Sequence, residues 1–318
     1  AGLALLLLPM VGDRTGLFFV ILLVEAAAMF VLYPVAFASI ARLDLAIPTQ
    51  RSITVITLFG GVASTIFWPL TLWLYNVMGW ETTWMVLGIA YLLVAVPIHF
   101  FALSGPERDD TTKNEHDTES WPELQGRDRK KGMVWMFVSF MFSGYLIGAV
   151  MTLWVTNVQD LGHSAAMAAA AGAVIGPFKT IGRCLDLLVT GNLRPMNTYL
   201  FCLALILSGF LTILALGFTW PGLMLAAALY GMGDGIKTIA RGTMPLALFG
   251  HRGYGARLGW ITFGSMALNA SSPFIFALLT ETYGGWWSFA VMAGIASIAI
   301  ATFFFIPDPR RDPAYDPA

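Results

Sequence analysis

The chain has 318 residues, of which 57% are hydrophobic and 12% are charged, and its mean hydropathy is +0.72. Soluble globular proteins carry about a quarter of their residues as Asp, Glu, Lys or Arg, so this composition excludes a soluble domain. The 18 basic and 19 acidic residues give a formal charge of -1, so no general basic field is present to attract nucleic acid. The two cysteines, Cys184 and Cys202, lie in apolar stretches and provide neither a disulfide framework nor a metal-ligand spacing.

Nine stretches of the chain are apolar over the roughly 20 residues that a helix needs to cross a bilayer. Residues 1–10 form a tenth apolar run that is too short to span, and we interpret it as the end of a helix that begins before the chain does. Lipid cannot satisfy backbone polar groups, so all spans are predicted to be helices. The nine candidate spans are 16–41, 52–76, 82–103, 132–157, 164–190, 196–217, 221–248, 257–281 and 286–306.

Basic residues gather in alternate loops. Thirteen of the 18 lie in loops of one parity or in the C-terminal tail, and only Arg14 lies in the others. The positive-inside rule therefore predicts the orientation of this multi-pass protein, which we expect in the cell inner (plasma) membrane. The parts expected in the cytoplasm are the loops 42–51, 104–131, 191–195 and 249–257 and the C-terminal tail.

A single offset of 206 residues relates two halves of the chain, because Gly79-Trp80 recurs as Gly285-Trp286. The offset covers six spans and keeps their orientation, which indicates a parallel repeat. We expect the first half to begin about 75 residues before the chain, enough for about two and a half helices. The predicted parts are the remainder of an N-terminal bundle (1–103), a charged cytoplasmic linker (104–131), a C-terminal six-helix bundle (132–306) and a cytoplasmic tail (307–318).

Two segments resemble the fifth and tenth helices of a bacterial branch of the major facilitator superfamily. The first is GGVASTIFWPLT, residues 60–71, and the second is GMGDGIKTIARGTMPLALFG, residues 231–250. The resemblance implies an all-α polytopic membrane protein with two parallel six-helix halves, here lacking about two and a half N-terminal helices. It also implies a secondary active transporter that works by alternating access, as a monomer, with no cofactor and no enzyme activity.

The resemblance further implies that the spans 16–41, 132–157 and 221–248 line a central cavity and that 164–190 and 257–281 flank it. A charged side chain at the centre of a bilayer costs at least about 2.5–3.5 kcal/mol. Charged residues in these spans are therefore expected to face a wet cavity or a partner.

Charged residues of two spans form two stripes, each on one helix face. At a rise of about 1.5 Å per residue, the two lysines share one depth and the two arginines another. We predict that all four basic residues bind substrate. The alternative is that each acid neutralises a basic neighbour in a structural pair. One stripe is Lys179, Arg183 and Asp186, and the other is Asp234, Lys237 and Arg241.

Glu25 has no basic neighbour within a turn or two of its own helix. A carboxyl at membrane depth either finds a cation on another helix or takes up a proton. Glu25, with Asp234 as the second candidate, is therefore predicted to carry a coupling proton. The alternative is that Glu25 pairs permanently with a residue of the expected first helix.

Five further residues are predicted to serve conformational change. Pro69 and Pro273 lie in helices that correspond in the two halves, where kinks would assist a rocking motion. Gly231, Gly233 and Gly235 favour close helix packing or local unwinding. The sequence shows no catalytic or metal-binding constellation, so no site of either kind is predicted.

The charges within the spans are four basic and three acidic, a balance of +1 that favours an anionic or organic-acid substrate. The expected partners are thus a small solute, H⁺ and the bilayer, and no nucleic acid. One alternative is a proton-driven drug or multidrug efflux antiporter. A more remote alternative is a polytopic membrane enzyme or receptor, which would need a catalytic cluster near the membrane or a folded soluble module.

Overall fold

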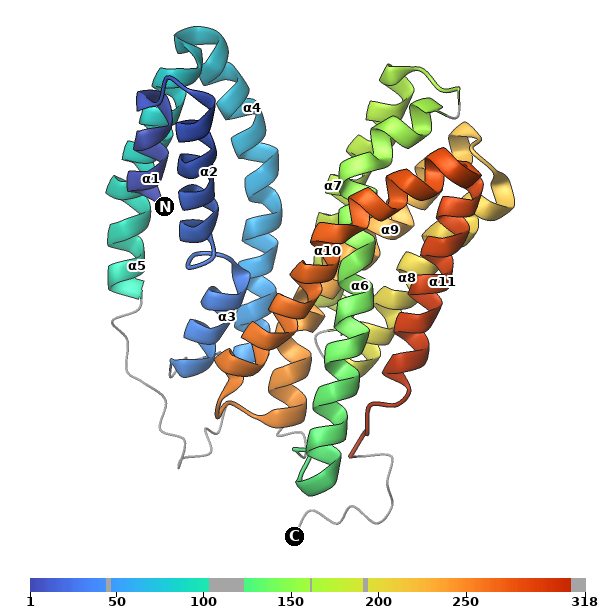
Figure 1. Ribbon diagram of the computed structural model, residues 1–318. Helices are drawn as coiled ribbons and strands as arrows, with labels where there is room; N and C mark the ends of the chain where they lie inside the picture. The colour runs from blue at the N-terminus through green and yellow to red at the C-terminus, as the bar shows by residue number, and fades with distance from the viewer. Residues whose placement is uncertain (44–46, 103–122, 161, 191–193, 310–318) are drawn as a thin grey trace. The chain divides into compact units, whose positions relative to one another are not determined.

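The computed structural model of the chain describes residues 1–43, 47–102, 123–160, 162–190 and 194–309. These residues form a series of helices (Figure 1), in which η marks short 3-10 or π segments. In chain order they are α1 (Gly2–Leu7), η1 (Leu8–Met10), α2 (Arg14–Ala28), α3 (Tyr33–Arg42), α4 (Thr49–Ala90), η2 (Tyr91–Ala95), α5 (Val96–Ala102), α6 (Gly126–Asp160), α7 (Ala165–Leu185), η3 (Asp186–Thr190), α8 (Pro195–Leu216), α9 (Trp220–Phe249), α10 (Tyr254–Tyr283) and α11 (Gly285–Phe303).

The chain divides into two compact units. Unit 1 comprises Ala1–Thr49 and Phe59–His116, and unit 2 comprises Gln50–Leu58 and Asp117–Ala318. The first turns of α4 therefore belong with the C-terminal helices, whereas the rest of α4 belongs to unit 1.

In unit 1, α2 starts where the Asp13 side chain caps it. The carboxylate accepts hydrogen bonds from the backbone N–H groups of Thr15 and Gly16, both at 3.1 Å, and so satisfies two donors that a helix start leaves open. The expected span 16–41 is built from α2 and α3, with the break at residues 29–32. Together they are apolar enough to cross a membrane.

The long helix α4 is in fact two helices joined at Gly79. Gly79 has φ 77° and ψ 171°, a backbone conformation that residues with a side chain rarely adopt. Figure 1 shows the chain folding back after the first of these two helices. The turn separates the expected spans 52–76 and 82–103, and the second of them continues through η2 into α5.

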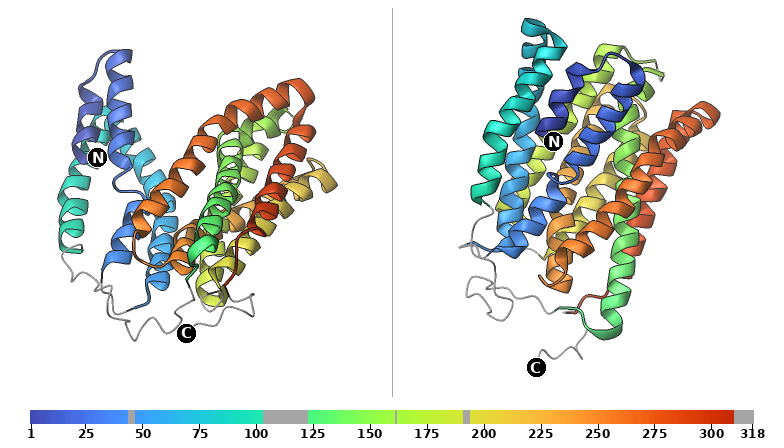
Figure 2. Two further views of the ribbon diagram at one scale, coloured as in Figure 1. Left: turned by 60° about the horizontal axis from the view of Figure 1, so that its bottom comes forward. Right: turned by 60° about the vertical axis from the view of Figure 1, so that its left-hand side comes forward.

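Unit 2 contains a bundle made of α6 to α11, seen from two further directions in Figure 2. Its first helix begins at Gly126, so the last six residues of the expected linker, 126–131, are helical. A run of polar residues can form the first turns of a helix whose later turns are apolar. The linker residues up to 122 lie outside the part of the chain that the structure describes.

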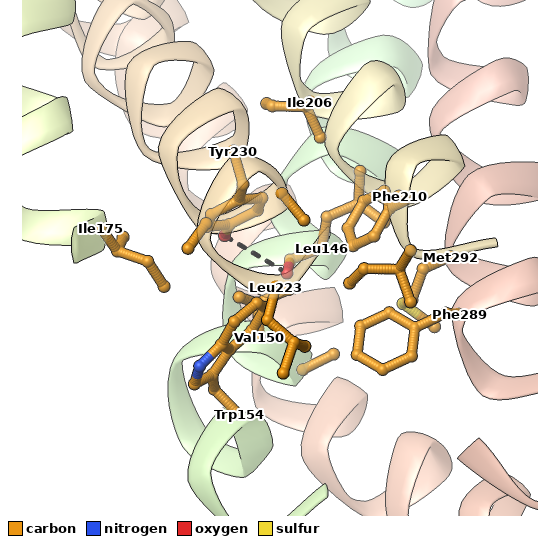
Figure 3. Close-up of a cluster of buried hydrophobic side chains, with 14 of the residues drawn as sticks. Leu146, Val150, Trp154, Ile175, Ile206, Phe210, Leu223, Tyr230, Phe289 and Met292 are labelled. Atoms are coloured by element: carbon orange, nitrogen blue, oxygen red, sulfur yellow. Dashed lines mark hydrogen bonds between the residues drawn. The ribbon is translucent and has the colours of Figure 1, made fainter. Parts of the chain in front are cut away.

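Two buried apolar clusters hold the bundle together. The larger draws side chains from α6, α7, α8, α9, α10 and α11, and Figure 3 shows its centre, where the Tyr230 hydroxyl donates to the Leu146 carbonyl oxygen at 3.5 Å. The smaller cluster includes Tyr199, which stacks on Phe140 with ring centroids 4.3 Å apart. Buried aromatic rings of this size contribute much of the packing of a helical bundle.

The two halves share one backbone feature. Gly79 and Gly284 both have positive φ, 77° and 86°, and a hydroxyl four residues later donates to the glycine carbonyl. The distances are 2.7 Å from Thr83 Oγ1 to Gly79 O and 3.2 Å from Ser288 Oγ to Gly284 O. By this backbone feature Gly79 corresponds to Gly284, whereas the Gly-Trp sequence motif makes it correspond to Gly285. The offset between the two halves is therefore one residue shorter at this turn than the 206 residues found from the sequence.

Six helices in the described residues are long and apolar enough to cross a membrane, against nine spans expected. The other three expected spans, 52–76, 164–190 and 221–248, are also helical. In α7 and α9 the glycines and the charged stripes lower the apolarity. These two less apolar helices carry the candidate substrate-binding residues.

Candidate functional site

The site begins with an unusually close contact between α7 and α9, made possible by glycine. A Cβ added at Gly231 would lie 2.6 Å from the carbonyl oxygen of Ile175, and one added at Gly182 would lie 2.5 Å from that of Met232. A Cβ at Gly235 would overlap the carbonyl oxygen of Lys179. Small residues let two backbones approach in this way, and here they bring the two charged stripes together.

Three charged side chains meet at this contact, and we name them the charge triad: Lys179 of α7, and Asp234 and Lys237 of α9. Lys179 Nζ lies 2.6 Å from Asp234 Oδ2, and Lys237 Nζ lies 3.1 Å from Asp234 Oδ1. Lys237 Nζ also donates to the backbone carbonyl of Ser143 in α6 at 3.0 Å. The triad thus joins three helices of unit 2.

The triad is buried to different degrees. Asp234 and Lys237 are 4% and 5% exposed, whereas the Lys179 side chain keeps 24% of its exposure. Buried charges persist only when paired, and here one carboxylate serves two ammonium groups. The triad therefore carries a net charge of +1, and Lys179 is its most accessible member.

The pairing of Asp234 with Lys237, which the sequence analysis gave as the alternative to substrate binding, is present. The sharing of the same carboxylate by Lys179 was not foreseen. The spacing along one helix fixes which residues share a face, as for Asp234 and Lys237. The face of α7 that turns toward Asp234 and Lys237 depends on the glycine contacts between the two helices. The spacing of residues along the sequence does not predict these contacts.

A hydroxyl network that the sequence reasoning missed lies beside Lys237. The Tyr199 hydroxyl of α8 is within hydrogen-bond distance of Ser139 Oγ at 3.0 Å and Ser143 Oγ at 3.2 Å. Both serines donate to backbone carbonyls, those of Ala299 and Phe140. The sequence did contain a signal for this network, since Ser139 and Ser143 are four residues apart in an apolar span and therefore lie on one helix face.

Arg183 and Asp186 lie elsewhere, against the first turns of α4. Arg183 Nη1 donates to the Thr57 carbonyl oxygen at 2.9 Å, and Thr54 Oγ1 lies 3.4 Å from Asp186 Oδ2. Both charged residues are buried, at 7% and 5% exposure. The structure therefore brings the lysines of the two stripes together and directs Arg183 to the segment 50–58.

The remaining predicted residues are distributed as follows. Arg241 lies one turn beyond Lys237 on α9 and is half-buried, and Glu25 lies exposed on α2 in unit 1. Pro69 and Pro273 lie inside α4 and α10, which continue through them.

Gly233, like Gly231 and Gly235 on α9, faces the backbone of a neighbouring helix. A Cβ at Gly233 would lie 2.8 Å from the Cys202 carbonyl oxygen of α8. The structure therefore shows close helix packing at these glycines, which is one of the two expectations for them.

Comparison with known proteins identifies the class. Residues 1–196 match the family model of the Major Facilitator Superfamily, which covers more than half of the chain, so the chain belongs to that superfamily. No curated protein sequence matches it. The resemblance to this superfamily is confirmed: the chain is a multi-pass membrane protein and a secondary transporter of small molecules, in a family of transporters and not of enzymes.

Solved structures share its fold at low sequence identity. The fucose:proton symporter FucP of E. coli superposes with a TM-score of 0.69 at 11% identity, over 96% of this chain and 80% of FucP. A structure of FucP in the outward conformation gives a TM-score of 0.71 at 14% identity with the same coverage. The human organic anion transporter MFSD10 (TETRAN) gives 0.65 at 14% identity, over 95% of this chain and 74% of that protein. At these identities the likeness establishes the fold alone.

Proposed function

We propose that this transporter carries a small organic anion, driven by a proton, by alternating access as a monomer in the cell inner membrane. One observation carries the substrate class: the charge triad brings two ammonium groups and one carboxylate together inside the helical bundle of unit 2. A second carboxylate, supplied by the substrate, would complete the balance of charge. An organic cation would face a net positive site and be rejected by it.

Lys179 and Lys237 are the proposed primary contacts of the substrate anion. They belong to different helices, and Asp234 brings both ammonium groups to one point. Arg241, one turn further along α9, and Arg183, buried against α4, are proposed as outlying members of the same basic set. MFSD10, whose fold this chain shares, is itself an organic anion transporter, which is compatible with the proposal and carries none of its weight.

The anion proposal is tested by flux into proteoliposomes that contain the full-length protein, with a panel of mono- and dicarboxylates and a cationic dye. Lys179→Gln removes a charged contact worth about 1.5–3 kcal/mol, so KM for the anion should rise by about 10- to 100-fold. The matched control is Lys131→Gln, because Lys131 is an exposed lysine in the first turns of α6. Dye transport without any anion transport in the parent protein would establish the drug-antiporter alternative instead.

Proton coupling is proposed for Glu25, with Asp234 as the second candidate. Glu25 is the carboxyl of α2 that lies at membrane depth without a basic residue near it in the sequence. Substrate-evoked proton flux should be lost in Glu25→Gln and retained in Glu81→Gln, a control at the predicted outer end of a span. Unaltered proton coupling in both Glu25→Gln and Asp234→Asn would overturn the assignment.

A further inference from the structure

We propose that Asn269, with Thr262 two turns away on the same face of α10, forms a subsite for hydroxyl groups, so that the transported anion is a hydroxylated carboxylate. The inference rests on the proposed function, which supplies the contact of the carboxylate at the charge triad. It adds a neutral, hydrogen-bonding contact on a further helix. Asn269 and Thr262 would then decide between hydroxylated and unsubstituted anions.

Asn269 lies at the middle of α10, a helix long and apolar enough to cross a membrane. The residue is half-buried, and its amide oxygen lies over Gly148 of α6, where an added Cβ would be only 2.6 Å away. Its backbone carbonyl accepts from Ser272 Oγ at 2.9 Å, whereas its amide has no hydrogen bond within the part of the chain that the structure describes. An amide both donates and accepts, and lipid tails offer neither partner. The Asn269 amide therefore needs water or a polar ligand beside it.

Thr262 is an independent sign of the same need. It is 7% exposed, and its hydroxyl has no hydrogen-bond partner among the described residues. Thr280 and Thr282 of the same helix donate to the carbonyl oxygen four residues earlier, at 2.9 Å and 2.7 Å, a bond that threonine in a helix commonly makes. A buried hydroxyl without a partner is unfavourable and calls for an explanation. Thr262 and Asn269 are seven residues apart, so they lie on one helix face about 10.5 Å from each other.

The subsite lies at the level of the charge triad, because both are in register with the same part of α6. The Ser143 carbonyl of α6 accepts from Lys237 of the triad at 3.0 Å. At the next residue, Gly144, an added Cβ would lie 2.8 Å from the Cβ of Ser265 in α10. The two subsite residues come three residues before and four residues after Ser265, about 4.5 Å and 6 Å along the helix. A short organic acid held at the triad therefore has the subsite within one helical turn of its own level.

The chemistry of the two side chains defines the group that they recognise. An amide and a hydroxyl both donate and accept hydrogen bonds, and neither carries a charge. A substrate hydroxyl matches them, because it also donates and accepts. A methylene group in the same place would leave both side chains without a partner. Sites built to hydrogen-bond a hydroxyl therefore discriminate strongly against the analogue that lacks it.

The experiment compares matched anions in proteoliposomes that contain the full-length protein. The pairs are butyrate with 3-hydroxybutyrate, succinate with malate, and hexanoate with gluconate, and the members of each pair differ only in hydroxyl groups. In the parent, kcat/KM should be at least about tenfold higher for the hydroxylated member of a transported pair. Asn269→Leu and Thr262→Val should each lower this preference by about 2- to 12-fold, the worth of one neutral hydrogen bond. Transport of the unsubstituted member should change by less than about twofold, since it has no such bond to lose.

Two controls separate the subsite from a general effect on folding. Both members of a pair are measured on one preparation, so a loss of folded protein lowers both rates alike and the preference still reports the site. Thr262→Val should unfold at the temperature of the parent or above it, because its hydroxyl has no bond to lose. The matched control is Ser271→Ala, which removes a hydroxyl of α10 that already donates to the Leu268 carbonyl at 2.8 Å. It should leave the preference unchanged.

The outcomes distinguish this inference from the proposed function on which it rests. A parent protein that moves no anion would refute the proposed function. A parent that moves both members of a pair equally well would refute the hydroxyl subsite alone. The same holds for an unchanged preference in Asn269→Leu or in Thr262→Val, which would leave these residues a role in the packing of α10 only.

Discussion

The charge triad and the contact of Arg183 with α4 make an instructive comparison, because both come from charged stripes with nearly the same spacing. In the triad, charges from two helices compensate one another within 3.1 Å. Arg183 instead donates to the neutral carbonyl of Thr57. A charged side chain in an ion pair can exchange its partner for a charged ligand. A charged side chain that is hydrogen-bonded to a backbone carbonyl instead holds two segments of the chain together. The comparison predicts binding effects at the triad and stability effects at Arg183.

The largest expected effect comes from disturbing the helix contact under the triad. Gly235→Ala places a methyl group against the Lys179 backbone carbonyl, which cannot move as a flexible side chain could. Overpacking of this kind costs about 1–3 kcal/mol, and the separation of α7 from α9 should abolish anion transport. Thermal unfolding in detergent and proteoliposome flux measure the two effects.

Gly176→Ala is the matched control for Gly235→Ala. Gly176 lies in the same helix as Lys179, and a Cβ there meets nothing within 4 Å. Because Ala favours a helix over Gly by about 1 kcal/mol, this variant should be as stable as the parent or slightly more so. Equal loss of transport in both variants would show that close approach of α7 and α9 is not what forms the site.

The next effect sharpens the distinction between the two regions. Arg183→Met removes the charged hydrogen bond to Thr57 O, a bond of a kind worth about 1.5–3 kcal/mol. We expect a lower unfolding temperature and a smaller rise in KM for the anion than in Lys179→Gln. A rise in KM as large as that of Lys179→Gln would make Arg183 a full member of the binding group and remove the distinction.

Much of the architecture was predictable from the sequence, since long apolar runs give spans with little ambiguity. Local spacing also placed Asp234 and Lys237 on one helix face, and their pairing was the alternative to the prediction that Lys237 binds substrate. The sequence could not show that Lys179 shares the same carboxylate, because the rotation of α7 is set by backbone contacts at Gly231 and Gly235. Nor could it show that Arg183 would meet α4, which depends on packing between segments more than 120 residues apart.

A further test concerns the hydroxyl network beside Lys237. Tyr199→Phe removes the hydroxyl that lies near Ser139 and Ser143, but both serines keep their carbonyl acceptors. No buried donor is left unsatisfied, so the loss of stability should be about 1 kcal/mol. KM should stay near that of the parent, because Lys237 is held by the carbonyl of Ser143 and not by its hydroxyl. A KM raised as far as in Lys179→Gln would instead place the network in the binding site.

The smallest effect is expected where the contact with α4 is weakest. Thr54 Oγ1 lies 3.4 Å from Asp186 and 3.2 Å from the Gln50 carbonyl, and its one hydrogen cannot serve both acceptors well. Thr54→Val keeps the shape of the side chain, so we expect a loss of stability of about 0.5 kcal/mol.

Thr57→Val is the companion variant of Thr54→Val. Arg183 binds the backbone carbonyl of Thr57, while the Thr57 hydroxyl bonds within its own helix, to Thr54 O at 2.7 Å. The bond from Arg183 should therefore survive this substitution. Thermal unfolding of both valine variants in the parent and in Arg183→Met measures the coupling: the effect of Thr57→Val should be the same in either background. A strong dependence on Arg183 would mean that side chains, and not the backbone of α4, hold this contact.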